Sequence, residues 1–257
     1  MSNNDMICLT CSLQDLWNTD MIVMVCLRDE RCVMTKIKVE DLLNLKETIA
    51  ASLFTGVTYP WEVLSKLSNY IIELGQTLAE GDYDQVGQDV WVSKSATIAP
   101  TASITGPTII GHHAEVRHCA YIRGSVIVGE SAIVGNSTEL KNVVLFNRVQ
   151  VPHFNYVGDS ILGYQSHIGA GGITSNQKSD KSAILVQADG ARLETGLTKL
   201  GTILGDHVEV GSNSVLNPGS VVGRGTTVYP LSMVRGVIPA QSIYKKQGDL
   251  VEKSVRG

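Results

Sequence analysis

Four cysteines near the start of the chain are the first residues whose types and spacing could do chemistry. They are Cys8, Cys11, Cys26 and Cys32, and four thiolates so close in sequence could in principle hold a zinc ion. The spacing argues against this, because Cys26 and Cys32 are separated by five residues, whereas zinc ligand pairs typically have about two to four between them. Cys26 also lies inside an apolar run, and Cys119 makes the cysteine count odd. We therefore expect reduced thiols rather than a metal site or a disulfide framework.

Several function classes lack their sequence signature. The chain contains neither GxxxxGK[ST] nor a GxGxxG motif between a strand and a helix, so no phosphate-binding loop is expected. A net charge of −4 and a pI of about 5.9 argue against nucleic acid as the main partner. The apolar run at residues 21–27 is too short to span a bilayer and lacks the flanks of a secretion signal. We therefore expect a cytoplasmic protein with no membrane partner.

An aliphatic residue recurs at every sixth position, and this repeat predicts the elements that would position any site. A period of six matches neither a helix nor an amphipathic strand, so it predicts short strands joined by corners and stacked as the coils of a solenoid. Short side chains follow four positions later, where bulk would prevent the next coil from packing. The aliphatic positions are Val92, Ile98, Ile104, Ile110, Val116, Ile122, Val128, Val134 and Leu140, and again Leu204, Val210, Leu216, Val222, Val228 and Val234.

The repeat is interrupted twice. We expect the register to hold until Val151 and then to slip within VPHFNYVGDSILG, where a loop or bulge would leave the coil and could carry chemistry. Residues 177–201 form a second, polar interruption that is too long for a tight corner. Its composition is compatible with an extruded hairpin or arm, and segments of this length are usually functional or disordered.

Three regions of different character are expected along the chain. Residues 1–85 form an N-terminal region that has no clear period up to residue 33 and then two segments with helical spacing. These segments should form a cap over the first coil, which would otherwise expose an apolar end and a strand edge. The β-helix occupies residues 86–238 with its excursion at 177–201, and residues 239–257 form an extended or frayed tail.

The repeats IIGHHAEV, VIVGESAIVGNS and VEVGSNSVLNPGSVVGRGTTV resemble the hexapeptide-repeat acyltransferase superfamily. YIRGSVIVGESAIVGNSTELKN, VPHFNYVGD and HIGAGGITSNQK are most similar to the acetyltransferase domain of the bifunctional enzymes that make UDP-N-acetylglucosamine. The resemblance implies a mainly β, left-handed parallel β-helix with a small helical N-terminal cap. It also implies a homotrimer with active sites between neighbouring subunits. Residues 1–85 are too short for the nucleotidyltransferase domain of those enzymes and lack its glycine-rich loop.

The same resemblance assigns roles to individual residues. It implies acetyl-CoA as acyl donor, an amino-sugar phosphate or a nucleotide-linked amino sugar as acceptor, and no metal. His153 would be the base that removes a proton from the attacking amine, which suits a neutral imidazole. Asn176 would lie beside the reacting thioester. The remaining assignments are Arg123, Lys141 and Lys199 for the phosphate, Tyr156 and His167 for the acceptor, Ala170 and Gly171 for backbone amides near the thioester oxygen, and Ser212 for coenzyme A.

The chain also departs from the pattern that it resembles. His167 stands in place of an asparagine that contacts the acceptor, Gln177 replaces a tyrosine, and Pro152 replaces a glycine before the histidine. The excursion is longer than in the family. The base and the cations are kept while positions that read the sugar change, which favours a related but different amine or hydroxyl acceptor.

Two other functions are compatible with the sequence. A γ-type carbonic anhydrase shares the fold and binds zinc through three histidines, for which His113, His118 and His153 are candidates. The order of their short and long spacings is the reverse of that family's, and Ser125 replaces an aspartate after Arg123 and Gly124. The other alternative is a non-catalytic trimer that keeps a sugar-phosphate pocket for binding or assembly.

Overall fold

The computed structural model describes residues 36–78, 81–188 and 191–253. The four N-terminal cysteines lie outside these residues, so the prediction of reduced thiols stays a prediction. The described part is mainly β, with short helices near its start. The helical elements are α1 (Val39–Leu42), η1 (Leu45–Glu47), η2 (Ala51–Phe54), η3 (Pro60–Val63) and α2 (Leu67–Gly75). Among the described residues, no helix combines the length and the apolar character needed to span a bilayer.

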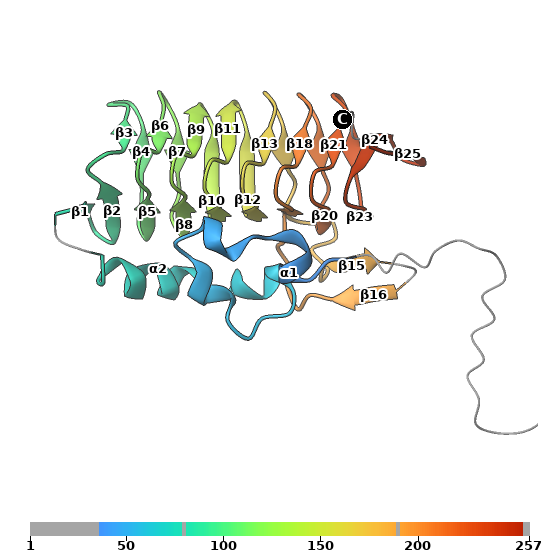
Figure 1. Ribbon diagram of the computed structural model, residues 1–257, viewed down its shortest axis with the longest axis horizontal. Helices are drawn as coiled ribbons and strands as arrows, with labels where there is room; N and C mark the ends of the chain where they lie inside the picture. The colour runs from blue at the N-terminus through green and yellow to red at the C-terminus, as the bar shows by residue number, and fades with distance from the viewer. Residues whose placement is uncertain (1–35, 79–80, 189–190, 254–257) are drawn as a thin grey trace, which may run out of the picture. The chain divides into compact units, whose positions relative to one another are not determined.

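The strands stack in three rows along a solenoid (Figure 1). The first row is β3 (Thr97–Ile98), β6 (Glu115–Val116), β9 (Ile133–Asn136), β11 (Gln150–His153), β13 (His167–Ile168), β18 (Glu209–Val210), β21 (Thr227–Val228) and β24 (Ser242–Lys246), which pairs with antiparallel β25 (Asp249–Glu252). The second row is β4 (Ser103–Ile104), β7 (Tyr121–Ile122), β10 (Glu139–Leu145), β12 (Tyr156–Leu162), β14 (Ile173–Thr174), β19 (Val215–Leu216) and β22 (Met233–Val234).

The third row begins with a hairpin and then shares two long strands with the second row. It consists of β1 (Tyr83–Gly87), antiparallel to β2 (Val90–Ser93), followed by β5 (Thr108–Ile110), β8 (Val126–Val128), the second halves of β10 and β12, and then β17 (Thr202–Leu204), β20 (Ser220–Val222) and β23 (Val237–Ile238). Apart from the terminal hairpins, neighbouring strands in all three rows pair in parallel. The predicted β-solenoid is therefore confirmed.

The corner chemistry explains the period of six. Ile98, Val116 and Val134 pair in register at successive coils, and the latter two are almost fully buried. Three residues after Ile110 and after Val116 the backbone turns through a left-handed conformation, with φ of 54° at His113 and 58° at Cys119. The next residue points back into the narrow interior, where Ala114 and Ala120 fit with at most 1% exposure. Short side chains are needed there because the coils pack at strand separation.

The predicted slip after Val151 is wrong in position and in kind. Residues 126–128 of β8 pair with 143–145 of β10, so the coil length drops from 18 to 17 residues between Leu140 and Val143. The same shortening recurs one coil later, where β10 pairs with β12. Each shortened corner omits one residue, and β10 and β12 run unbroken through it. No loop leaves the coil at VPHFNYVGDSILG, because these residues form β11 and β12.

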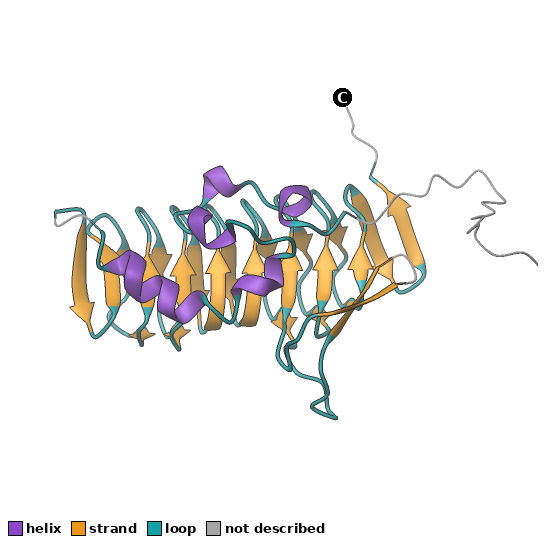
Figure 2. Cartoon of the chain, turned by 90° about the horizontal axis from the view of Figure 1, so that it is seen from below, coloured by secondary structure: helices purple, strands orange, loops and turns teal. Residues whose placement is uncertain are grey.

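The predicted cap is also placed differently. Helical turns form in both expected segments, but they lie along the third row rather than over the first coil (Figure 2). Helix α2 contacts β5 and β8, and η3 contacts β12. The reason is visible in the strands: Ile109 and Ile127 face outward from the coil interior yet are completely buried. Apolar residues on both sides of a strand require a cover on the outer side.

The two remaining segments form hairpins. The excursion contains β15 (Leu185–Ala188) and β16 (Ala191–Glu194), which pair antiparallel. It leaves the coil at Asn176 and returns at Leu200, whose amide donates to the carbonyl of Asn176 at 2.9 Å. The C-terminal segment was expected to be extended or frayed, but β24 continues the first row and β25 closes it up to Glu252.

Candidate functional site

The predicted base His153 and the predicted coenzyme A contacts Ala170 and Ser212 stack at the corner between the first and second rows, which we call the His153 corner. It is formed by the residues His118, Asn136, His153, Ala170 and Ser212, one from each successive coil. Backbone hydrogen bonds connect them: the residue after each donates to the carbonyl of the previous one, for example Phe154 to Asn136 at 2.8 Å and Asn213 to Ala170 at 2.8 Å. His153 is exposed. Within the described part of the chain, its ring has no hydrogen-bond partner, so its nitrogens are free for a ligand.

The two amides predicted near the thioester oxygen differ in their bonding. The Gly171 amide donates to the carbonyl of His153 at 3.0 Å and is therefore occupied. For the Ala170 amide, the described residues provide no acceptor within hydrogen-bond distance. A side chain at position 171 would also collide with Asn213, because an added Cβ would overlap its Oδ1, and φ at Gly171 is +72°. Glycine at this position therefore avoids the clash with Asn213, and because the Gly171 amide is occupied, Ala170 is the amide available to a ligand.

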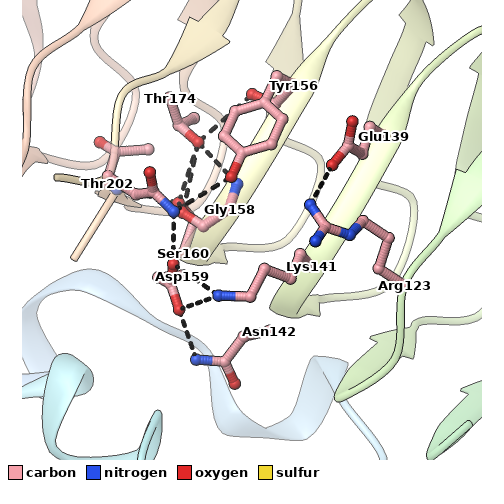
Figure 3. A network of polar contacts seen from close by, with 11 residues as sticks. Arg123, Glu139, Lys141, Asn142, Tyr156, Gly158, Asp159, Ser160, Thr174 and Thr202 are labelled. Carbon is pink, nitrogen blue, oxygen red and sulfur yellow. Dashed lines mark hydrogen bonds and ion pairs between the residues drawn. The ribbon is translucent and has the colours of Figure 1, made fainter. Parts of the chain in front are cut away.

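Other predicted residues gather at the corner between the second and third rows, which we call the Asn142 corner and which includes Lys141, Asn142, Asp159 and Asn176. Its centre is the carboxylate of Asp159, whose side chain is only 5% exposed. Asn142 Nδ2 donates to Asp159 Oδ1 at 2.9 Å, and Asn176 Nδ2 donates to Asp159 Oδ2 at 2.5 Å. Lys141 Nζ lies 3.5 Å from both carboxylate oxygens (Figure 3). A buried carboxylate needs such partners, because desolvation is costly for the charged form.

Tyr156 stands on the second row between the two corners, and Asn176 links it to Asp159. Asn176 Nδ2 donates to the Tyr156 hydroxyl at 3.1 Å. Burial, and next the charge of Asp159, raise the pKa of the Tyr156 phenol above its ordinary value. The phenol is protonated near neutral pH, as an ordinary tyrosine also is, and can donate a hydrogen bond to a ligand. Gly158 makes room for this arrangement, because a Cβ there would lie 2.6 Å from the tyrosine oxygen and 2.9 Å from Asn176 Nδ2.

Arg123 and Lys141 occupy the same position on successive coils, and each already has a carboxylate partner. Arg123 donates to Glu139 Oε1 at 2.7 Å, with side chains 43% and 32% exposed. Exposed ion pairs contribute little to stability, so the guanidinium can exchange Glu139 for another anion at small cost. Lys141 is held more loosely, at 3.5 Å from the buried Asp159. The two cations are thus balanced by two carboxylates before any ligand binds.

Buried hydroxyl groups determine where the excursion re-enters the coil. The Thr202 amide donates to Ser160 Oγ at 3.0 Å, and Ser160 Oγ donates to the carbonyl of Gly158 at 2.7 Å (Figure 3). Thr174 Oγ1 accepts from the Gly158 amide at 2.9 Å. These bonds anchor the chain directly after Lys199, which is exposed at the mouth of the excursion. Lys199 and Asn176 therefore lie at the two ends of the excursion.

His167 is the predicted residue that lies apart from the rest. It projects from the first row, and its Nδ1 lies 2.9 Å from Glu209 Oε2 on the next coil. The histidines considered for zinc are also separated, since His113 belongs to the corner between the third and first rows while His118 and His153 share another. Within the described ranges, no three His, Cys, Asp or Glu side chains are grouped as metal ligands.

Three residues of this site were missed from the sequence: Glu139, Asn142 and Asp159. Asn142 and Asp159 adopt left-handed backbone conformations, with φ of 54° and 47°. A signal was available, because Asn142 and Asp159 follow the last inward aliphatic by two positions instead of three, where the hexapeptide register shortens. Glu139 carries no such signal, since it is an ordinary outward residue of a strand.

Residues 104–249 match the protein family described as the GMPPB C-terminal domain. The chain belongs to this family. One relative of this chain is the bifunctional protein GlmU of Methanococcus maripaludis, which is 30% identical over 201 residues. The matched region covers 77% of this chain and 48% of the relative. A bifunctional sugar-1-phosphate nucleotidylyltransferase/acetyltransferase of Sulfurisphaera tokodaii is 35% identical over 98 residues, 38% of this chain and 24% of the relative.

The GMPPB C-terminal-type chain thus spans about half or less of the length of these curated relatives. Among solved structures, the acetyltransferase domain of PglB from Neisseria gonorrhoeae in complex with acetyl coenzyme A matches 60% of this chain and 53% of its own. Its sequence identity is 17% and the TM-score is 0.32.

Proposed function

We propose that this protein transfers an acetyl group from acetyl-CoA to the amine of an amino-sugar phosphate or a nucleotide-linked amino sugar. The observation that carries the proposal is the stacking of His153, Ala170 and Ser212 on successive coils of one corner. This arrangement aligns a free imidazole, a free backbone amide and a hydroxyl along a line that an extended acyl donor could follow. The names of the two bifunctional relatives are consistent with it, since one of them includes an acetyltransferase.

The proposed reaction uses His153 as its base. The acceptor amine attacks the thioester carbonyl, and His153 takes the proton that the nitrogen loses as the C–N bond forms. The Ala170 amide donates to the oxyanion of the tetrahedral intermediate. When the C–S bond breaks, the proton on His153 passes to the leaving thiolate, which gives an amide and a free thiol and restores the neutral imidazole. Ser212 contributes a hydroxyl to the donor on the next coil.

The acceptor would bind toward the Asn142 corner. The Tyr156 phenol, which is protonated at neutral pH, would donate to a sugar oxygen, and Asn176 would hold the phenol in place. Arg123 and Lys199 are the cations best able to contact the phosphate, because Arg123 has only an exposed partner and Lys199 is exposed. Lys141 would act more through Asp159 than directly on the phosphate. His167 is proposed as a peripheral contact to the acceptor.

A homotrimer belongs to this proposal. His153 and Asn176 project from different corners of one chain, so a neighbouring subunit would bring a His153 corner to an Asn142 corner. Outward residues of the second row support such packing: Tyr121, Val215 and Met233 are 45%, 38% and 53% exposed on one column of the row. Large apolar residues gathered on one face of a protein mark contact surfaces. A cytoplasmic location, where acetyl-CoA is available, completes the proposal.

A non-catalytic sugar-phosphate-binding trimer is the second candidate. The departures at His167 and Gln177 favour it, because the resemblance expects an asparagine and a tyrosine at these two positions. The occupied Gly171 amide favours it as well. Under this reading the protein binds a sugar phosphate without consuming acetyl-CoA.

The test is release of free thiol from acetyl-CoA with glucosamine 1-phosphate and related amino-sugar phosphates, with and without added zinc. We expect zinc-independent turnover that His153→Ala lowers by about 10²- to 10⁴-fold. His118→Ala is the matched control, since His118 is also exposed and lies on the same corner two coils earlier. Turnover that survives His153→Ala would exclude His153 as the base. Zinc-dependent CO2 hydration that His118→Ala abolishes, without thiol release, would favour the carbonic anhydrase-like reading, and binding of sugar phosphate without turnover would favour the non-catalytic one.

A further inference from the structure

A groove lies between the hairpin β15–β16 and the last coils of the Asn142 corner, and we call it the excursion groove. Its volume is about 520 Å³, within the range of about 300–1,000 Å³ typical of small-molecule sites. Three segments far apart in the sequence build it: Gln177 and Lys178 from the start of the excursion, Leu185 and Arg192 from the hairpin, and Asn217 and Arg235 from the last coils. The hairpin that forms one wall of the groove packs against the solenoid, because β15 lies against β23 (Figure 1).

Packing keeps the hairpin against the coils. Gly219 has φ of +78°, and a Cβ there would lie 2.7 Å from Ile184 Cγ2. Ile184 and Val186 are completely buried, although they belong to a segment that leaves the solenoid. The wall of the groove that carries Arg192 is therefore held by an apolar contact rather than by charge.

The lining of the groove is positively charged. Lys178, Arg192 and Arg235 contribute to it, and its other side chains are neutral, with no carboxylate among them. In the described part of the chain, none of these three cations forms an ion pair. Lys178 Nζ donates to Ser182 Oγ at 3.2 Å and to the carbonyl of Ala183, which orients it without neutralising it. The nearby Asp180 accepts from the Ser182 amide, and Lys178 is one of the groups that lower its pKa, so Lys178 is partly compensated although Asp180 does not line the groove.

Arg235 differs from two other cations of the second row, Arg123 and Lys141, in having no carboxylate partner among the described residues. Arg123, Lys141 and Arg235 all project from the second row, each two residues after the outward residue of its strand. Arg123 and Lys141 are balanced by Glu139 and Asp159, whereas Arg235 has no such neighbour. Of these three cations, the one without a carboxylate partner among the described residues is therefore the one that lines the excursion groove.

We propose that the excursion groove binds the phosphate groups of a phosphorylated ligand, with Arg192 and Arg235 as its direct contacts. Arginine suits this role because its planar guanidinium can donate two hydrogen bonds to one phosphate. The amides of Gln177 and Asn217 add neutral donors to the same space. The assignment of that ligand to a substrate, either the acyl donor or a nucleotide-linked sugar, rests on the proposed function. The phosphate site itself does not.

Isothermal titration of the full chain with inorganic pyrophosphate at low salt tests the site. We expect Arg192→Gln and Arg235→Gln each to weaken pyrophosphate binding by about tenfold, the value of one charge-assisted hydrogen bond, and Arg235→Lys to weaken it less. Arg148→Gln is the matched control, because it removes an exposed arginine from a different corner and should leave the affinity unchanged. Thermal melts of all variants verify folding. No binding to the wild-type chain, or an affinity lost in Arg123→Gln and kept in Arg235→Gln, would overturn the proposal.

Titrations with coenzyme A, dephospho-coenzyme A and UDP-N-acetylglucosamine identify the ligand. Loss of coenzyme A affinity in the two arginine variants, with UDP-N-acetylglucosamine unaffected, assigns the groove to the donor, and the reverse pattern assigns it to a nucleotide-linked sugar. If neither ligand depends on the arginines, the substrate assignment is refuted even where pyrophosphate binds. These measurements require no turnover, so a failure of the acetyltransferase proposal leaves the phosphate site separately testable.

Discussion

Asn142 and Asp159 occupy the same corner on successive coils, 17 residues apart, and Asn142 Nδ2 donates to Asp159 Oδ1 at 2.9 Å. Both adopt a left-handed backbone conformation, which asparagine and aspartate tolerate better than most residues with a Cβ. Their hydrogen bond aligns the two shortened corners of the solenoid. It also orients the carboxylate so that Lys141 and Asn176 reach it from either side.

Removal of that carboxylate should destabilise the fold. Asp159→Ala leaves Asn142 and Asn176 without their acceptor in a part-buried site, so the free energy of unfolding should fall by about 1–3 kcal/mol in urea denaturation. Glu115→Ala is the control, because Glu115 pairs with Arg117 on the surface and should change stability by less than about 1 kcal/mol. Equal effects of the two substitutions would mean that the Asp159 cluster contributes no more than a surface pair.

Gly158→Ala should reduce activity through position rather than chemistry. The added Cβ would press on the Tyr156 oxygen and on Asn176 Nδ2, so both side chains must shift. We expect acetyl transfer to fall by about 10- to 100-fold, as for other displacements of positioning groups by about 1 Å. Gly87→Ala has ordinary space around its added Cβ and should leave activity unchanged. Full activity in Gly158→Ala would remove Tyr156 and Asn176 from the proposed acceptor site.

The charge of Asp159 should be measurable at Tyr156. Burial and Asp159 raise the pKa of this phenol, whereas only burial raises that of Tyr244. Asp159→Asn should therefore lower the pKa of Tyr156 and leave that of Tyr244 in place, as followed by NMR of the tyrosine ring carbons with Tyr156→Phe for assignment.

The raised pKa of Tyr156 also determines how the stability of the fold depends on pH. Because the folded-state pKa of Tyr156 is raised, the folded protein holds the proton more tightly, and stability should decrease as pH rises above the ordinary tyrosine value of about 10. Asp159→Asn should reduce this decrease. An unchanged Tyr156 titration in that variant would show that the carboxylate does not act on the phenol.

Asp206 should prove to be the anchor of the helical segment. Its oxygens accept from the amides of Asn44 and Tyr164, both at 2.9 Å, and one lies 3.2 Å from Arg224 Nη2. Asp206→Ala should lower the free energy of unfolding by about 3 kcal/mol, at the low end for a broken buried pair because Arg224 is 36% exposed.

Asp206→Asn separates the charge from the hydrogen bonds. Burial raises the pKa of Asp206 although Arg224 and the two amides oppose the shift, so the neutral asparagine avoids a desolvation cost and still offers one acceptor. It should destabilise less than alanine. Hydrogen exchange at Asn44 should accelerate in Asp206→Ala, and protection equal to wild type would mean that the segment is held by apolar packing alone.

The repeat architecture followed from the sequence by itself, because it depends on local chemistry. An inward aliphatic such as Val116 and a small residue such as Ala120 are needed at each coil of a narrow solenoid. Both kinds of residue therefore recur in the sequence at a fixed spacing. The stacking of His153, Ala170 and Ser212 did not follow from the period, since the resemblance alone suggested their roles. Shortened coils and the excursion separate them in sequence, and the structure shows that they share one corner.

Only the tertiary structure decided what lies outside the coils. Asp206 meets Asn44 across 162 residues, and Asn147 donates to the carbonyl of Glu47 across 100, so the helices lie along the third row for reasons that no local spacing encodes. The shortening of two corners by one residue likewise brought Asp159 under Asn142 and moved the site to where the excursion opens. Local period determines a solenoid because each coil contacts only its neighbours, whereas its cover and its site depend on pairings between distant residues.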